Sequence, residues 1–132
     1  MLGAPVLVGL FGVAVALGTL GRVWSGPADL LAHLDRGGTA AVAGVFSILV
    51  NNLPASSLLA ARHPGHPFSL LVGLNLGPNL FVTGSLAWIL WLRAAHATGS
   101  RPSIGKACGL GVIAVPLSMA AALATLTLSG LH

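Results

Sequence analysis

The chain of 132 residues is 55% hydrophobic and 6% charged, where a soluble domain carries about 25% charged residues, and its mean hydropathy is +0.94. Its formal net charge is +4. The basic residues stand singly at the ends of apolar blocks, as membrane-interface anchors do, and do not form the clustered basic face of a nucleic-acid-binding protein. They are Arg22, Arg36, Arg62, Arg93, Arg101 and Lys106. The composition therefore excludes an ordinary soluble domain and a nucleic-acid partner, and it predicts an all-α integral membrane protein in contact with the lipid bilayer.

The first predicted elements are a membrane helix and a surface helix. Residues 5–21 form an uncharged apolar run of about 17 residues, the lower limit for a helix that spans a bilayer. Residues 27–36 follow and hold both acids of the chain, Asp29 and Asp35. Pro27 stands at a helix-start position and leucines recur at helical spacing, so we expect a short interfacial helix here.

The next apolar segment, residues 38–62, is interrupted by the sequence NNLP. In a continuous helix Pro54 would cost about 3 kcal/mol or more, and unpaired burial of the amides of Asn51 and Asn52 would cost roughly 2–7 kcal/mol each. The helix is therefore expected to break at the asparagines. Each arm is too short to cross a hydrocarbon core roughly 30 Å thick. We predict a re-entrant hairpin over residues 38–62, and a kinked span is the alternative.

Two further membrane segments are predicted. Residues 67–97 are interrupted by NLGPN, in which Gly77 loosens the backbone and Pro78 removes a hydrogen-bond donor. The flanking parts are long enough for a broken helix that crosses the membrane. Residues 106–131 are predicted to form the last transmembrane helix, with a kink at Pro116.

The two breaks together suggest a substrate-binding site. Half-helix ends and free amides that meet inside a membrane are the arrangement by which many transporters bind substrates and coupling ions. The alternative is that each proline is a packing kink and that each asparagine links neighbouring helices. The candidate substrate-binding residues are Asn51, Asn52, Pro54, Asn75, Gly77, Pro78, Asn79, Thr83 and Ser85.

Catalytic and metal-binding patterns are not evident in the sequence. The single cysteine, Cys108, is interpreted as a packing residue, and the five histidines lack the spacing of metal ligands. No nucleophile–base constellation and no glycine-rich phosphate loop occurs. We therefore expect neither an enzyme nor a bound metal or cofactor.

The segments LVNNLPASSLL and LLVGLNLGPNLFVTGSLAWILWLR resemble the C-terminal part of the arsenite-efflux permeases (arsenical pump membrane proteins) of the ion transporter superfamily. In that family an NNLP or NNMP segment precedes a G-x-N-L-G-P-N/K segment that continues into G-S-L-A-x-x-L-W. The matching residues are Asn51, Asn52, Leu53, Pro54, Gly73, Asn75, Leu76, Gly77, Pro78, Asn79, Gly84, Ser85, Leu86, Ala87, Leu90 and Trp91.

The resemblance implies half of an inverted-repeat transporter: a surface helix, a re-entrant hairpin, a helix broken at mid-membrane and a closing helix. It implies a multi-pass protein of the cell (plasma) membrane that exports arsenite or antimonite, driven by the proton gradient alone or with an efflux ATPase partner. The first repeat and the first helices of the second are absent from the sequence. We therefore expect a fragment, a truncated gene product or one subunit of a split transporter, with a missing N-terminal half as its partner.

Two alternatives remain open at this stage. One is an ion or dicarboxylate carrier of the same superfamily, for example a sodium/proton antiporter, and the other is a non-transporting membrane remnant or subunit. The candidate amides and hydroxyls carry no fixed charge, which suits a neutral metalloid hydroxide and suits a sodium-bound anion nearly as well. Proton coupling needs an ionisable group within the membrane, so a coupling acid is expected in the missing part unless Asp35 approaches the pathway.

Overall fold

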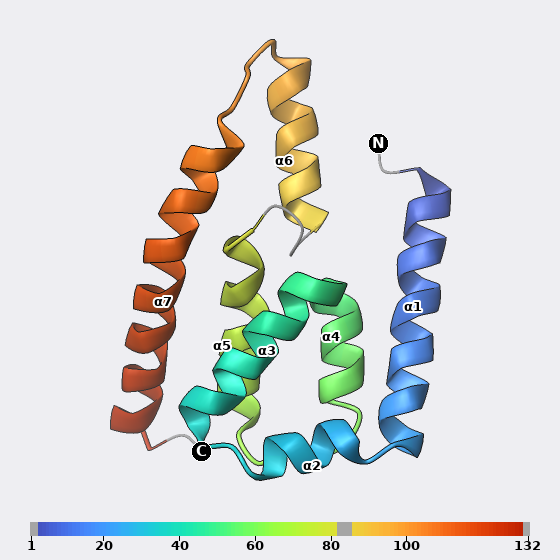
Figure 1. Cartoon of the computed structure of the whole chain (residues 1–132), viewed down its shortest axis with the longest axis vertical. Helices are drawn as coiled ribbons and strands as arrows, with labels where there is room; N and C mark the ends of the chain where they lie inside the picture. Colours follow the sequence, from blue (N-terminus) through green and yellow to red (C-terminus); the bar gives the residue numbers. More distant parts are fainter. Residues whose placement is uncertain (1–2, 82–85, 131–132) are drawn as a thin grey trace.

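A computed structural model describes residues 3–81 and 86–130, which form helices joined by turns, with no strand among them (Figure 1). The elements in chain order are α1 (Ala4–Val23), α2 (Gly26–Ala32), α3 (Arg36–Val50), α4 (Asn52–Leu59), α5 (Pro67–Leu76), the 3-10 helix η1 (Gly77–Asn79), α6 (Leu86–Ala97) and α7 (Ile104–Leu128). The expected all-helical class is confirmed for the described residues.

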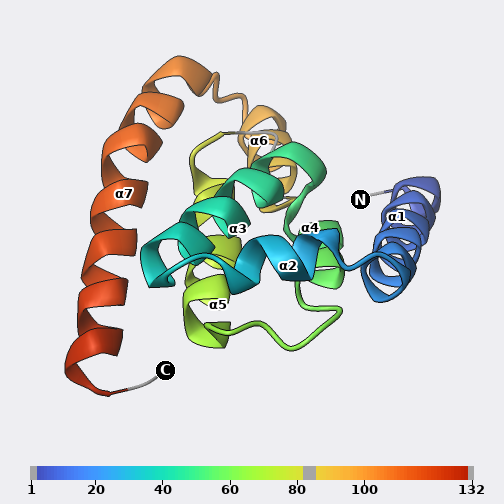
Figure 2. The same cartoon turned by 60° about the horizontal axis from the view of Figure 1, so that its bottom comes forward.

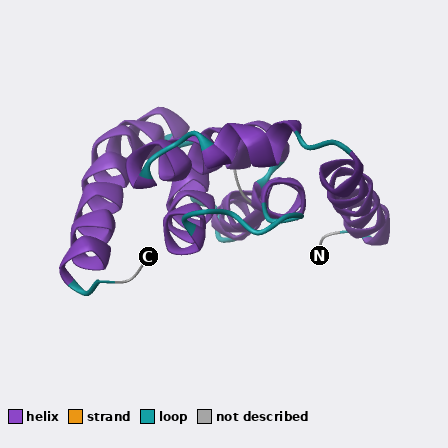
Figure 3. Cartoon of the chain, turned by 90° about the horizontal axis from the view of Figure 1, so that it is seen from below, coloured by secondary structure: helices purple, strands orange, loops and turns teal. Residues whose placement is uncertain are grey.

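Helices α1 and α7 are the two described helices that are long and apolar enough to cross a membrane. They stand at the outer edges of the molecule, with α3, α4 and α5 between them (Figures 1 and 3). Both expose large apolar side chains: Val8 and Phe11 of α1 are 69% and 68% exposed, and Leu117 of α7 is 66% exposed. Outward-facing apolar surface of this kind is stable in lipid and costly in water, which supports a membrane location.

The boundary between α2 and α3 differs from the sequence prediction. The surface helix expected over residues 27–36 ends at Ala32, and α3 begins at Arg36 instead of at residue 38. The cause is Asp35, whose carboxylate accepts a hydrogen bond from the main-chain N–H of Gly38 at 2.8 Å. This N-cap satisfies one of the free donors at the start of α3, so Asp35 and Arg36 belong to the next helix.

Helices α3 and α4 fold back on each other as a helical hairpin with Asn51 at its turn (Figures 1 and 2). The open end of the hairpin lies beside the C-terminus of α1. There the Arg62 side chain donates hydrogen bonds to the main-chain oxygens of Gly21 at 3.4 Å and Arg22 at 2.9 Å. A guanidinium on the last carbonyls of a helix also compensates the negative end of its dipole, so this contact joins the hairpin to α1.

The hairpin packs on α5 through small residues. The missing side chain of Gly73 makes room for the main-chain oxygen of Ala40 and the methyl group of Ala43, and Gly77 lies against the backbone of Gly44. Close approach of helix backbones through small residues at four-residue spacing is typical of helix pairs in membranes. The buried apolar cluster that surrounds this contact comprises Leu31, Ala43, Ala55, Leu59, Leu70 and Leu74.

The C-terminal helices are less closely packed. Helix α7 starts at Ile104, capped by the Ser103 hydroxyl, and contains Pro116. It approaches η1 at Gly111, where an added Cβ would lie 2.6 Å from the main-chain oxygen of Asn79. Helix α6 extends away from the other helices in Figure 1. The predicted element over residues 67–97 thus comprises α5, η1 and α6, and residues 82–85 within it lie outside the described part of the chain.

Candidate functional site

The turn between α3 and α4 is built on one unusual residue. Asn51 has φ 74° and ψ 152°, and it is the one non-glycine residue with a positive φ among those described. This backbone region is almost restricted to glycine, and a side chain held there costs on the order of 1–3 kcal/mol. The Asn51 side-chain oxygen, Oδ1, is buried and has no hydrogen-bond partner in the described part of the protein.

The helix break falls at Asn51 alone, because Asn52 and Pro54 belong to the first turn of α4. Pro54 is fully buried, and in the first turn of a helix its missing N–H removes no intrahelical hydrogen bond. Pro54 therefore fits the first turn of α4 and does not itself break a helix. Asn51 stands between the free carbonyls at the end of α3 and the free N–H groups at the start of α4, which carry partial charges of opposite sign.

The amides at the second break bond to their own helix. The Asn75 amide donates to the main-chain oxygen of Leu71 at 2.8 Å, and the Asn79 amide donates to the main-chain oxygen of Asn75 at 3.2 Å. Both side chains are exposed, whereas Gly77 and Pro78 are buried in the contact with α3. Gly77 and Pro78 are thus packing positions, and the amide N–H groups of Asn75 and Asn79 stabilise the break locally.

The two breaks lie close together, but their amides do not converge. A Cβ on Gly77 would lie 2.9 Å from the Ser47 hydroxyl oxygen, and Ser47 precedes Asn51 by about one helical turn, roughly 6 Å along the axis of α3. Asn51 presents a buried acceptor there, while Asn75 and Asn79 face outward. Of the predicted site residues, Thr83 and Ser85 lie outside the described residues.

A small pocket adjoins the second break and was not expected from the sequence. It has a volume of about 300 Å³ and is lined by Asn79, Ala87, Trp88, Trp91 and Ala107. Trp88 and Trp91 form an edge-to-face pair with ring centroids 5.3 Å apart. Residues three apart lie on the same face of a helix, so the spacing of Trp88 and Trp91 could have predicted that the two rings meet. No sequence pattern predicts that Asn79 lies beside these two rings.

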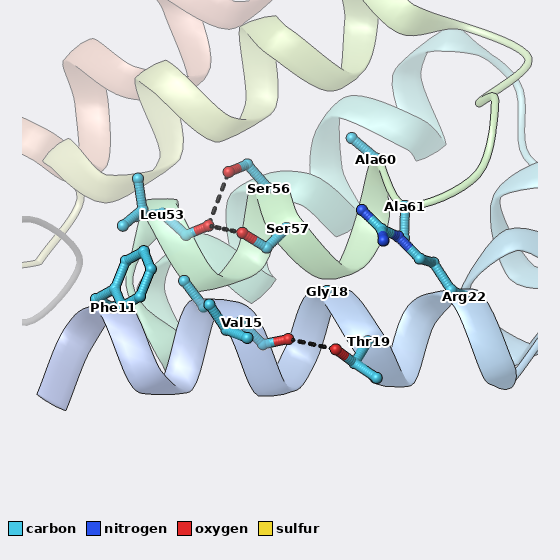
Figure 4. Close-up of a pocket in the computed structure, with 11 residues that line it drawn as sticks. Phe11, Val15, Gly18, Thr19, Arg22, Leu53, Ser56, Ser57, Ala60 and Ala61 are labelled. Atoms are coloured by element: carbon cyan, nitrogen blue, oxygen red, sulfur yellow. Dashed lines mark hydrogen bonds between the residues drawn. The ribbon is translucent and has the colours of Figure 1, made fainter. Parts of the chain in front are cut away.

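A larger groove lies between α1 and α4, and it too was missed at the sequence level (Figure 4). Its volume is about 630 Å³. Phe11 and Leu53 stand at one end and Arg22 at the other, with Gly18 and Ser57 between them. The four-residue spacing of Ala14 and Gly18, next to Ser56 and Ser57 in the hairpin, was the available signal for a close contact of α1 with another helix.

Among the described residues, no group of three or more His, Cys, Asp or Glu side chains lies close enough together to bind a metal ion. Cys108 is half-buried within α7. The polar groups at the two breaks are amides, a buried hydroxyl and helix ends. These groups can donate hydrogen bonds to a ligand or accept them from it, but they carry no fixed charge.

Comparisons with known proteins returned no match: no protein-family model, no curated protein and no solved structure is similar to this chain. Membership of a family is therefore not shown. The resemblance to the arsenite-efflux permeases is therefore an expectation that rests on the two segments over residues 49–59 and 70–93 of the sequence.

Proposed function

We propose that this chain is part of the core of a multi-pass plasma-membrane transporter that exports arsenite or antimonite. In this proposal α3 and α4 form a hairpin that re-enters the membrane, and α5, η1 and α6 form the helix broken at mid-membrane. The observation that carries the proposal is Asn51, a strained residue whose buried side-chain oxygen has no hydrogen-bond partner among residues 3–81 and 86–130.

Asn51 destabilises the folded chain in two ways. Glycine would relieve the backbone strain at this position, and an unpaired buried acceptor costs about 1–3 kcal/mol more. Trivalent arsenic in water is a neutral hydroxide with three O–H donors, and such a donor would satisfy the Asn51 oxygen when bound. The end of α3 and the start of α4 supply further acceptors and donors around it, as half-helix ends do in transporter sites.

The proposal includes partners that complete the site. In an inverted-repeat transporter a single hairpin supplies one side of the substrate site, and the other repeat supplies the opposite side. Of the two acids, Asp35 caps α3 and Asp29 lies exposed on α2. A proton-coupling acid is therefore proposed in the complementary half, or the export is driven by an efflux ATPase.

A sodium-coupled carrier for an ion or a dicarboxylate is the second candidate. The same unpaired oxygen of Asn51 favours it, because an acceptor next to the carbonyl end of α3 is also a ligand for a small cation. The two candidates differ in one measurable property: uptake or export by the carrier depends on a sodium gradient, and metalloid export does not.

Membrane sidedness tests the re-entrant hairpin. We expect single cysteines in place of Ala32 and Gly65, in a Cys108→Ala background, to react with a membrane-impermeant maleimide from one side, and a cysteine in place of Ser100 to react from the other. These three positions are exposed. Labelling of intact and inverted vesicles makes the measurement. If residues 38–62 formed a kinked span, Gly65 would be labelled from the side opposite to Ala32.

Metalloid export tests the function. Residues 1–132 would replace the corresponding segment of an arsenite permease, and the chimaera would be expressed in an arsenite-sensitive bacterium. We expect resistance, its reduction with Asn51→Ala or Asn52→Ala, and no resistance from residues 1–132 alone. Each lost hydrogen bond to a desolvated substrate costs about 1–3 kcal/mol, whereas an asparagine that only links helices contributes less than about 2 kcal/mol.

Controls separate loss of function from loss of protein. Cys108→Ala is expected to leave export unchanged, and the amount of each variant in the membrane is measured beside efflux from everted vesicles. Normal efflux from both asparagine variants would identify the break at Asn51 as a packing kink. Sodium-dependent transport of a carboxylate by the same chimaera would favour the second candidate, and resistance from the chain alone would contradict the need for a complementary half.

A further inference from the structure

The groove between α1 and α4 has one polar end and one apolar end. Phe11 of α1 and Leu53 of α4 form the apolar end, and the Arg22 side chain extends over Ala61 at the other end (Figure 4). Gly18 of α1 faces Ser57 of α4, and a Cβ added to Gly18 would lie 3.5 Å from the Ser57 Cβ, an ordinary van der Waals contact. The groove is therefore a long, shallow channel between two helix surfaces that touch through small residues.

The hydroxyl groups along the groove are already used within their own helices. Ser56 and Ser57 both donate to the main-chain oxygen of Leu53, at 2.7 and 3.1 Å, and Thr19 donates to the main-chain oxygen of Val15 at 2.9 Å. Each hydroxyl has one proton to donate, so these walls offer an occupant no further hydroxyl donor. The middle of the groove thus suits an apolar occupant.

The charge at the polar end is positive. Within the described part of the chain no side chain pairs with the guanidinium of Arg22, and the Arg62 guanidinium lies 2.9 Å from the Arg22 main-chain oxygen. No acidic residue lines the groove. An occupant that complements it therefore carries an anionic group at the Arg22 end and a long apolar chain toward Phe11.

The length of the groove matches one leaflet of a bilayer. From Phe11 to Arg22 the helix rises about 16 Å at 1.5 Å per residue, which is about half of a hydrocarbon core roughly 30 Å thick. We propose that this groove binds an anionic phospholipid, with its phosphate at Arg22 and an acyl chain between α1 and α4. Basic pockets between membrane helices are known sites for anionic lipid headgroups. The proposal depends on a membrane location and not on the transported substrate.

Native mass spectrometry of the full chain in mild detergent tests the proposal, with equimolar phosphatidylglycerol and phosphatidylcholine of identical acyl chains. We expect one retained lipid per chain and a preference for phosphatidylglycerol of about fivefold or more, as one arginine near a phosphate contributes. Arg22→Gln should abolish this preference and Arg22→Lys should keep it. Val15→Phe should lower retention of both lipids, because its ring fills the groove.

Matched controls lie outside the groove. Arg101→Gln removes the same charge elsewhere, and Val13→Phe adds the same ring on an exposed position of α1 that does not line the groove; both should behave like the unsubstituted chain. Equal retention of the two lipids by that chain would overturn the proposal, as would displacement of the lipid by glycerol phosphate, which marks a free-anion site. A lipid-free dimer that Val15→Phe dissociates would assign the groove to a second copy and would also overturn it.

Discussion

Replacing Gly73 by alanine is expected to push α3 away from α5 and to lower the free energy of unfolding by about 1–3 kcal/mol or more. The added Cβ would overlap the main-chain oxygen of Ala40 and would lie 2.7 Å from the Ala43 Cβ. Neither neighbour is the end of a flexible side chain, so the helix backbones themselves must move. Thermal unfolding in detergent, followed by circular dichroism and by protease resistance, measures the loss.

The matched control for this substitution is Gly109→Ala in α7. No atom lies within 4 Å of the position of its added Cβ, and alanine in a helix interior is favoured over glycine by about 0.5–1 kcal/mol. Gly109→Ala should therefore leave stability unchanged or slightly raised. If Gly73→Ala matched Gly109→Ala in stability, the close α3–α5 contact would be wrong, and with it the position of Gly77 beside Ser47.

Replacing Asn51 by glycine is expected to change stability and transport in opposite directions. Glycine relieves about 1–3 kcal/mol of backbone strain and removes the buried, unpaired Oδ1. Against this stands a backbone-entropy cost of about 0.5–1 kcal/mol, so the net change should be stabilising by about 1 kcal/mol. Metalloid export by the chimaera should fall about five- to a hundredfold, because the substrate loses a hydrogen-bonding partner.

Asn51→Ala serves as the comparison, because alanine lacks the amide but keeps a Cβ in the strained conformation. It should lose transport as Asn51→Gly does, and it should be less stable than Asn51→Gly by the backbone strain of about 1–3 kcal/mol that only glycine relieves. Unfolding in detergent and efflux from everted vesicles are measured on the same preparations. Raised stability together with full efflux in Asn51→Gly would falsify the proposed role of the amide, because the strained residue would then not be needed to bind the substrate.

The sequence by itself determined the features that depend on local chemistry. Long apolar blocks predict membrane helices, since unpaired backbone groups cannot face lipid, and α1 and α7 satisfy that expectation by length and composition. The positions of the breaks were also accessible. Proline and glycine act on the backbone within a few residues of themselves, and the chain is interrupted at Asn51, three residues before Pro54, and at Gly77 and Pro78.

Element boundaries were accessible only in part. From the sequence, Asp35 could belong to the end of α2 or to the start of α3, and the sequence pattern favoured the end of α2. The hydrogen bond from the Gly38 N–H decides for the second, because a cap depends on the direction in which the chain enters the helix. Likewise, Asn51 and Asn52 are equivalent in the sequence, and only the path of the hairpin gives Asn51 the positive φ.

Only the tertiary structure decided which polar groups are free and which helices touch. Asn75 and Asn79 resembled Asn51 as candidate ligands, yet their amides bond to their own helix, while the Asn51 oxygen stays buried with no partner in the part of the chain that the structure describes. The contact of α4 with α1, and hence the groove that ends at Arg22, joins segments about forty residues apart in the chain. Local propensity carries no information about such pairings, because they arise from the shapes of helix surfaces that meet only after folding.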